Sequence, residues 1–284
     1  MPYVFLFIFG LVVGSFMNVI ALRYDGERFV ADPAVIGGRS HCPHCGTTLR
    51  WYELVPVVSF VVQGRRCRHC QAAIGWQYPA VELVSALIVT FVPAFLFSIA
   101  DTTAPVIVLS VIWVVIFEIL LLVAYIDLRL GIIPDELNLA LGVLGVFLLI
   151  EIGGFFGLAN HSFFGSFAPA FGYQGSLWLN HLAAALGATA FFALLVGITR
   201  GRGMGLGDVK LAAPLGLIFG WPDIGMLVVV AFVSGALVGV GLIAARRRTM
   251  KGSIPFGPFL VGAAAVTFFA GFPIVRAYFD LVAR

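Results

Sequence analysis

Asp127 and Asp208 are the two carboxylates whose positions in the sequence could support acid–base chemistry. Asp127 closes a long apolar run, and Asp208 follows Gly205-Leu206-Gly207 directly before another apolar run. A charge at the mouth of a membrane span is costly, so each aspartate should have a partner or a function. If helix packing brings them together, one carboxyl keeps its proton and the other acts as a base. Such a dyad can activate a water against a peptide carbonyl and protonate the carbonyl oxygen, and it needs no metal at this site.

The cysteines of the chain form two Cys-x-x-Cys pairs, made by Cys42, Cys45, Cys67 and Cys70. Two such knuckles can offer four thiolates to one ion, and the pattern resembles a zinc ribbon whose spacer slightly exceeds the usual length. A reducing cytosol favours thiolate ligands over disulfides, and a closed tetrathiolate site would be structural. A redox role, or burial without a function, is the alternative. His44 and His69 lie inside the knuckles and could replace a ligand, although exposure is the simpler expectation.

The elements that must position these groups are membrane helices. The chain has 284 residues, of which 61% are hydrophobic and 11% are charged. A soluble domain of this length could not bury so much apolar surface, and a membrane β-barrel would show short alternating segments. We expect an all-α, polytopic membrane helix bundle of about eight spans with a small cytoplasmic zinc-ribbon-like module. The expected spans are residues 2–22, 80–100, 104–126, 136–157, 176–199, 209–221, 222–245 and 256–281.

Basic residues predict the orientation of these spans. Eight alternating spans place on one side Arg23, Arg28, Arg39, Arg50, Arg65, Arg66, Arg68, Arg129, Arg200, Arg202, Lys210, Arg246, Arg247, Arg248 and Lys251, and near the other side Arg276 and Arg284. The positive-inside rule therefore puts Asp127, Asp208 and the cysteines on the cytoplasmic side, with both termini outside. We expect a first transmembrane helix at 1–22, a cysteine-rich module at 23–79 and a transmembrane core at 80–284.

Several other acids have two readings. Asp127 sits at the end of its helix where the dipole disfavours an anion, and an ion pair with Arg129 is its structural alternative. Asp135 suits the first turn of the next helix. Glu118 and Glu151 lie deep in apolar runs, either as proton-path residues or as neutral, hydrogen-bonded acids inside the bundle.

Five further features carry weaker expectations. The piece 54–62 is too short to span and either packs inside the ribbon or lies on the membrane surface. The run 254–259 opens the last span and either lines a cavity or begins an ordinary proline-started helix. Pro214 and Gly216 should break the short span at 209–221. The outer loop 158–178 offers no recognisable chemistry, and His161 and His181 are expected to be loop or interfacial residues.

Several motifs, in this order, resemble the type IV prepilin peptidases, which belong with presenilin among the GxGD membrane aspartyl proteases. The matching stretches are Gly14-Ser15-Phe16-Met17-Asn18-Val19 with Arg23, the paired knuckles, Tyr78-Pro79-Ala80-Val81-Glu82-Leu83, Asp127 in a run ending Ile133-Pro134-Asp135, Gly205-Leu206-Gly207-Asp208, and Pro255-Phe256-Gly257-Pro258-Phe259. The resemblance covers nearly the whole chain and departs from the family chiefly in the length of the 158–178 loop. It implies that Asp127 and Asp208 are the catalytic aspartates.

The resemblance also implies an activity and partners. The family removes the short basic leader of type IV prepilins or type II secretion pseudopilins at the cytoplasmic face of the bacterial inner membrane. Many members also methylate the new N-terminal residue with S-adenosylmethionine, which no glycine-rich fingerprint of this chain supports independently. The expected partners are these precursors and the lipid bilayer, with no nucleic acid.

Two other classes of function are weighed against this one. An ion- or proton-coupled carrier should show broken helices in matching repeats, and the sequence has one broken helix near a carboxylate. A non-catalytic anchor whose ribbon recruits a partner leaves both aspartates unexplained.

Overall fold

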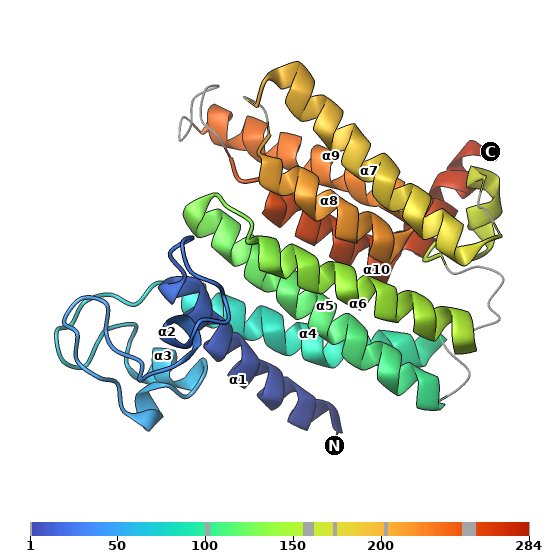
Figure 1. Ribbon diagram of the computed structural model, residues 1–284. Helices are drawn as coiled ribbons and strands as arrows, with labels where there is room; N and C mark the ends of the chain where they lie inside the picture. Colours follow the sequence, from blue (N-terminus) through green and yellow to red (C-terminus); the bar gives the residue numbers. More distant parts are fainter. Residues whose placement is uncertain are drawn as a thin grey trace. The chain divides into compact units, whose positions relative to one another are not determined.

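The computed structural model describes residues 2–99, 103–155, 162–172, 175–201, 204–245 and 254–283 (Figure 1). Its helices in chain order are α1 (Pro2–Arg23), α2 (Pro33–Ile36), η1 (Trp51–Glu53), α3 (Val58–Val62), α4 (Gln77–Ile99), α5 (Thr103–Leu130), α6 (Asp135–Phe155), η2 (Gly165–Phe171), α7 (Leu177–Thr199), α8 (Leu206–Phe219), α9 (Asp223–Ala244) and α10 (Gly257–Val282). The described residues hold no β-strand beyond two isolated bridges. The expected all-α class is confirmed.

Seven helices are long and apolar enough to cross a membrane, namely α1, α4, α5, α6, α7, α9 and α10. They match seven of the eight expected spans, which confirms a multi-pass membrane protein. The eighth expected span is α8, which has 14 residues and is shorter than a full crossing.

The break expected at Pro214 is wrong, because α8 continues through this residue. Neighbouring helices make proline tolerable inside a membrane helix, and α8 packs against both α6 and α7. The contact with α7 is a backbone contact, since a Cβ on Gly216 would lie 2.5 Å from the Cα of Ala185.

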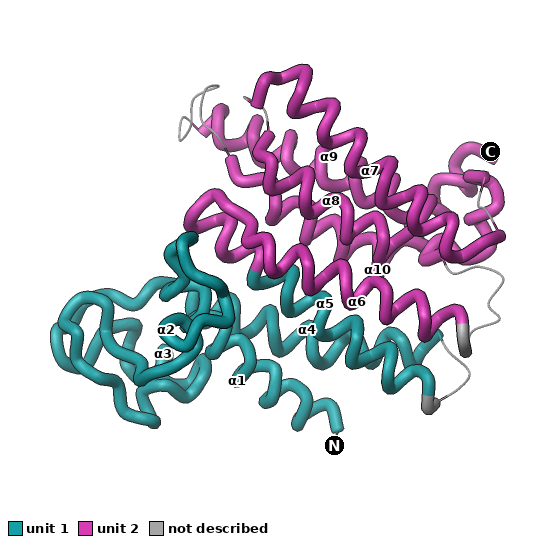
Figure 2. The backbone as a smooth tube through the Cα atoms, viewed as in Figure 1, with its two compact units in different colours: residues 1–122 teal, residues 123–284 magenta. Residues whose placement is uncertain are grey.

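The structure divides into two compact units, residues 1–122 and 123–284 (Figure 2). The boundary falls inside α5, so the first unit holds α1 to α4 with most of α5, and the second holds the last turns of α5 with α6 to α10. The first unit therefore contains the cysteines, and the second contains both Asp127 and Asp208. The expected division into 1–22, 23–79 and 80–284 is based on the expected roles of the segments, whereas the two units are defined by their internal contacts. The expected division therefore stays a prediction.

Glycines of α1 allow it to pack directly on the backbone of α4. A Cβ on Gly10 would lie 2.5 Å from a Cα of α4, and a Cβ on Gly14 would lie 2.6 Å from the Cα of Glu82. The side-chain amide of Asn18 donates to the carbonyl of Tyr78 at 3.1 Å, at the start of α4. The first sequence motif thus has a packing role, because it joins the two helices that flank the cysteine module.

A buried polar chain links α1, α4 and α5 in the first unit. Ser85 Oγ lies 2.7 Å from the carbonyl oxygen of Gly10 and 2.8 Å from Oε1 of Glu118. The hydroxyl has one proton and the carbonyl can only accept, so both contacts are hydrogen bonds only if Glu118 is protonated. Its Oε2 is buried without a partner among the described residues, which a carboxylate would tolerate poorly. Glu118 therefore fits the expected neutral, hydrogen-bonded acid.

Glu118→Gln is expected to keep the thermal stability of the protein, because the amide can donate to Ser85 Oγ as the protonated acid does. Glu118→Ala should lower the melting temperature by roughly 5 °C or more, since it removes a buried hydrogen bond and leaves a cavity. Thermal unfolding of the purified protein in detergent measures both. Equal destabilisation by glutamine and alanine would contradict a neutral acid at this position.

In the second unit, the start of α7 holds the end of α8. The Asn180 side chain accepts from the backbone N–H of Trp221 at 2.8 Å and donates to its carbonyl at 2.9 Å. Nδ1 of His181 lies 2.8 Å from the carbonyl oxygen of Leu217, and the ring is 2% exposed. The expectation of a loop residue at His181 is therefore wrong, because this histidine is a buried contact between two helices.

The expected outer loop 158–178 contains the helix η2 within its described residues. Phe164 and Ala168 are buried with Val275 of α10, and Phe167 stacks on Phe279 with ring centroids 5.1 Å apart. The phenylalanines that the sequence concentrates in this loop thus form a small apolar core against α10. The described residues do not include His161, Arg202, Arg246, Arg247, Arg248, Lys251 or Arg284.

Candidate active site and metal centre

Asp127 lies in the last turn of α5, and its carboxylate is bonded to the first residue of α10. The side chain is buried, and Oδ2 accepts the backbone N–H of Gly257 at 2.9 Å. The N-terminus of α10 carries the positive end of its helix dipole, which favours an anion. The poor position of Asp127 on its own helix is therefore offset by the start of another helix, 130 residues later in the chain.

Asp208 lies in the first turn of α8 and is also buried. Its Oδ2 accepts the backbone N–H of Gly205, the residue before the helix, at 3.2 Å. The carboxylate thus caps the N-terminus of α8, where the dipole again favours negative charge.

The two carboxylates are electrostatic neighbours within the second unit. Burial first, and then the nearby charge of Asp127, raise the pKa of the Asp208 carboxyl. Two carboxyl groups that repel each other in this way are more stable when one of them keeps its proton. The second unit therefore holds two buried carboxylates that influence each other's charge, each bonded to the backbone N–H at the start of a helix.

The glycines before Asp208 have different surroundings. A Cβ on Gly207 would lie 3.3 Å from Ile133, in the loop between α5 and α6, so this glycine serves packing within the chain. A Cβ on Gly205 would meet nothing closer than 3.8 Å. On the same helix, Nζ of Lys210 lies 2.7 Å from Oδ1 of Asp135, which joins α8 to the start of α6.

The contacts of Gly257 and Pro258 explain the glycine and the proline at the start of α10. Pro258 occupies the first turn of α10, as expected for a proline-started helix. A Cβ on Gly257 would lie 2.7 Å from Oδ2 of Asp127, closer than real Cβ atoms come to an oxygen. The sequence offered no direct sign of this contact, although a glycine beside two prolines at membrane depth suggested irregular backbone. Glycine is required here because its bare backbone meets the carboxylate.

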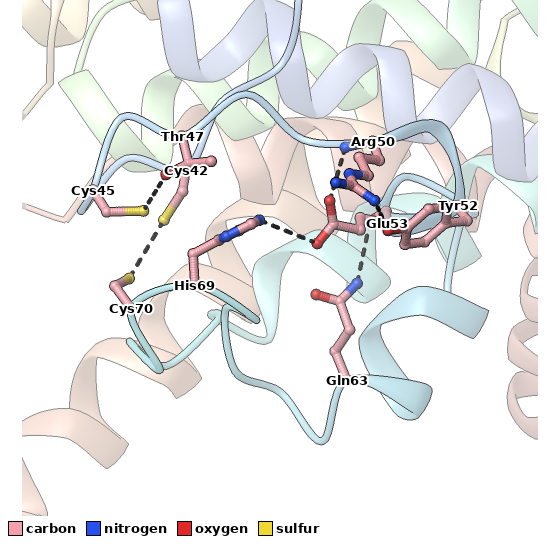
Figure 3. Close-up of polar contacts among 9 residues, drawn as sticks. All are labelled: Cys42, Cys45, Thr47, Arg50, Tyr52, Glu53, Gln63, His69 and Cys70. Carbon is pink, nitrogen blue, oxygen red and sulfur yellow. Dashed lines mark hydrogen bonds and ion pairs between the residues drawn. The ribbon is translucent and has the colours of Figure 1, made fainter.

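The four cysteines form one cluster in the first unit. Their Sγ atoms all lie within 4.8 Å of one another. Figure 3 shows Cys42, Cys45 and Cys70, and the Sγ atoms of Cys42 and Cys70 are 3.9 Å apart. Zn–S bonds of about 2.3 Å in a tetrahedron set sulfur–sulfur distances of about 3.8 Å. The geometry fits, so the cluster can bind a metal ion.

Two of these thiols have pKa values that are shifted in opposite directions. The pKa of Cys45 is lowered to about 6, chiefly by its hydrogen bond with the Thr47 side chain. The pKa of Cys70 is raised to about 11. The backbone hydrogen bond with Ala72 lowers this pKa, but desolvation and hydrogen bonds with the neighbouring thiols together raise it by more. Crowded thiols that cannot all ionise alone can do so around a divalent cation, which releases their protons.

Glu53 holds the two halves of the module together, a role the sequence did not reveal. Its Oε2 accepts the backbone N–H of Arg50 at 2.8 Å, and its carbonyl accepts from the Gln63 amide at 3.4 Å. The ring of His69 points toward Glu53, with Nε2 4.0 Å from Oε1 (Figure 3). His69 thus lies against Glu53, and the group of side chains that could hold a metal ion consists of the four cysteines.

Comparison with known proteins gives the family. Residues 8–96 match the family described as "Bacterial Peptidase A24 N-terminal domain", and residues 113–240 match "Type IV leader peptidase family". A Burkholderia pseudomallei protein is 34% identical over 96% of this chain and 87% of its own length. The chain belongs to the type IV leader peptidase family. The first matched region contains the cysteine cluster and the second contains Asp127 and Asp208.

Other relatives agree with this assignment. Proteins from Pseudomonas aeruginosa and Bacillus subtilis are 33% and 30% identical over 95% and 97% of this chain, and over 90% and 97% of their own lengths. All three relatives carry the name "Prepilin leader peptidase/N-methyltransferase". No solved structure matches the chain. Membership of the type IV leader peptidase family makes this protein a multi-pass membrane peptidase.

Proposed function

We propose that this protein is an aspartic endopeptidase that removes the leader of type IV prepilins or type II secretion pseudopilins. The observation that carries the proposal is the pair of buried carboxylates, Asp127 and Asp208, each bonded to the backbone N–H of a helix start. The names of the relatives supply the substrate class. The carrier class has no comparable support among the family matches.

The reaction uses the single proton of the dyad. The ionised aspartate takes a proton from a water as its oxygen attacks the scissile carbonyl, and the protonated aspartate gives its proton to the carbonyl oxygen. The tetrahedral intermediate then breaks its C–N bond as a proton passes to the leaving amine. The backbone bonds from Gly257 and Gly205 fix both carboxylates before the substrate arrives.

The site lies on the cytoplasmic side of the bacterial inner membrane in this proposal, together with the cysteine module. The support is the distribution of Arg and Lys along the sequence. A leader rich in Lys or Arg stays in the cytosol by the same rule, with its scissile bond at the interface next to the apolar stem helix.

A second step, N-methylation of the new N-terminal residue, is part of the proposal because the relatives' names include an N-methyltransferase. S-adenosylmethionine would supply the methyl group. The described residues assign no site to this cofactor.

Mass spectrometry of a co-expressed prepilin tests both steps together. We expect a mature chain that has lost its leader, and a further 14 Da per methyl group when the second step occurs, a mass that follows from replacing one hydrogen by CH₃ (~14 Da). An intact precursor in the presence of well-expressed protein would refute the peptidase, and a mature chain without added mass would refute the methylation alone.

The metal of the cysteine module is proposed to be zinc in a structural, tetrathiolate site. The four sulfurs fill a tetrahedral shell, which leaves no position for a substrate or an activated water. In this proposal the ion joins the two knuckles and the peptidase dyad uses no metal.

Elemental analysis of the purified protein should give about one zinc per chain. Changing Cys42 and Cys67 together to serine should remove the zinc and make the module sensitive to added protease, because metal binding and folding of such modules are coupled. The matched control is Thr48→Ser, which alters a hydroxyl residue of the first knuckle and no thiol. A metal-free protein with the same protease resistance would favour a redox role for the thiols.

A further inference from the structure

The short helix α3 presents an apolar face to its surroundings. Val58, Val61 and Val62 follow i, i+3, i+4 spacing and so share one side of the helix. They are 56%, 69% and 67% exposed, whereas Phe60 on the other side is buried inside the module. The expected packing inside the module is therefore confirmed for Phe60, whereas the three valines remain uncovered and contact with the membrane surface stays a prediction.

The start of α3 is attached to a membrane-spanning helix of the same unit. The backbone N–H of Val57 donates to Oε2 of Glu82 at 2.7 Å. Glu82 is buried five residues after Gln77, the first residue of α4, which is ~8 Å along the helix axis. The bond holds α3 beside the second turn of a membrane span.

Val57 itself adopts a backbone conformation that needs support. Its φ is 59°, which is rare and unfavourable for a β-branched residue. The bond to Glu82 and the helix that follows stabilise this turn, which directs the chain into α3. The position of the three valines is thus set by specific contacts.

Basic and aromatic side chains flank the valines. Arg65, Arg66 and Arg68 are exposed, and no acidic residue occurs between residues 54 and 76. The guanidinium of Arg65 lies 4.5 Å from the ring centre of Trp76, which packs on Phe60. Exposed valines with neighbouring tryptophan and arginine are the composition of segments that lie in the interface of an anionic bilayer.

We propose that the face of Val58, Val61 and Val62 inserts into the headgroup region of the bilayer, with Arg65, Arg66 and Arg68 against anionic phospholipid headgroups. The chain enters the module from span α1 and leaves it into span α4, so both ends of the module start at one membrane face. The bond between Val57 and Glu82 brings α3 to the same level. The proposal does not depend on the peptidase reaction or on the metal.

Photocrosslinking of the full-length protein in liposomes tests this placement. The photoreactive residue p-benzoylphenylalanine replaces Val61 in one variant and His44, an exposed residue of the first knuckle, in a matched variant. In vesicles that contain phosphatidylglycerol, we expect at least tenfold more lipid adduct from position 61 than from position 44. Unchanged melting temperatures establish that both variants are folded.

The contribution of the arginines is tested in the Val61 variant. Changing Arg65, Arg66 and Arg68 to glutamine should lower the lipid adduct about fivefold or more, because each arginine near an anionic surface contributes about that factor. Vesicles of phosphatidylcholine alone should give a similar decrease without the substitutions. Equal amounts of lipid adduct from positions 61 and 44 would overturn the proposal. Crosslinking of position 61 to protein alone, with no lipid adduct, would also overturn it.

Discussion

Asp127→Asn and Asp208→Asn are each expected to leave a co-expressed prepilin uncleaved. Asparagine keeps the size of the side chain and can still accept the backbone bond from Gly257 or Gly205. It cannot take or give the proton that the proposed reaction moves. Loss of one acid–base group alone costs about 10²- to 10⁴-fold in rate, and the two carboxyls act as a unit, so either change should reduce cleavage below detection.

Immunoblotting for precursor and mature prepilin measures this loss. Asp280→Asn is the matched control, because Asp280 is an exposed carboxylate near the end of α10 whose contact is a weak ion pair with Arg276. The control should process prepilin normally. Mature prepilin at normal levels in either dyad variant, with expression intact, would rule out the proposed mechanism.

Gly257→Ala is expected to reduce cleavage by at least about 100-fold, although the new methyl group carries no charge and enters no reaction. It would stand 2.7 Å from Oδ2 of Asp127, so either the carboxylate or the start of α10 must move. Either movement lengthens the bond that fixes Asp127, and a displacement of about 1 Å from productive geometry can cost this much rate.

Gly262→Ala provides the comparison on the same helix. A Cβ at Gly262 would meet nothing within 4 Å, so the alanine should be neutral or slightly stabilising. Initial rates of leader cleavage in detergent, with equal amounts of each variant, distinguish the two sites. If Gly257→Ala and Gly262→Ala cleave equally fast, the contact between Gly257 and Asp127 has no part in catalysis.

The features that the sequence predicted well depend on local information. Each long apolar run became a helix because about 20 apolar residues need a membrane and a helix satisfies their backbone. The cysteine cluster was predictable because a Cys-x-x-Cys pair directs two thiols toward one point without help from the rest of the chain. Asp135 likewise begins α6, as a residue suited to a first helical turn.

The features that the sequence did not predict depend on partners far along the chain. The bond from Gly257 to Asp127 spans 130 residues and involves a backbone group, which leaves no trace in residue type. His181 was misplaced for the same reason, since its partner is a carbonyl of α8. Pro214 was misread because packing against neighbouring helices outweighed its local preference.

The short length of α8 affects where a peptide bond must go to be cut. The end of α8 is bonded to the start of α7, because Asn180 contacts Trp221 and His181 contacts Leu217. From this shared level the two helices run side by side in opposite chain directions. Asp208 lies nine residues from Leu217, ~14 Å along α8, whereas Thr199 lies 18 residues from His181, ~27 Å along α7, so Asp208 stands ~13 Å short of the far end of α7. Asp208 is therefore held below the level at which α7 ends. In the proposed function, a scissile bond that reaches Asp208 lies below the end of α7, so the apolar stem of a prepilin stays in the lipid and avoids the cost of exposing its side chains, about 0.8 kcal/mol for each methylene.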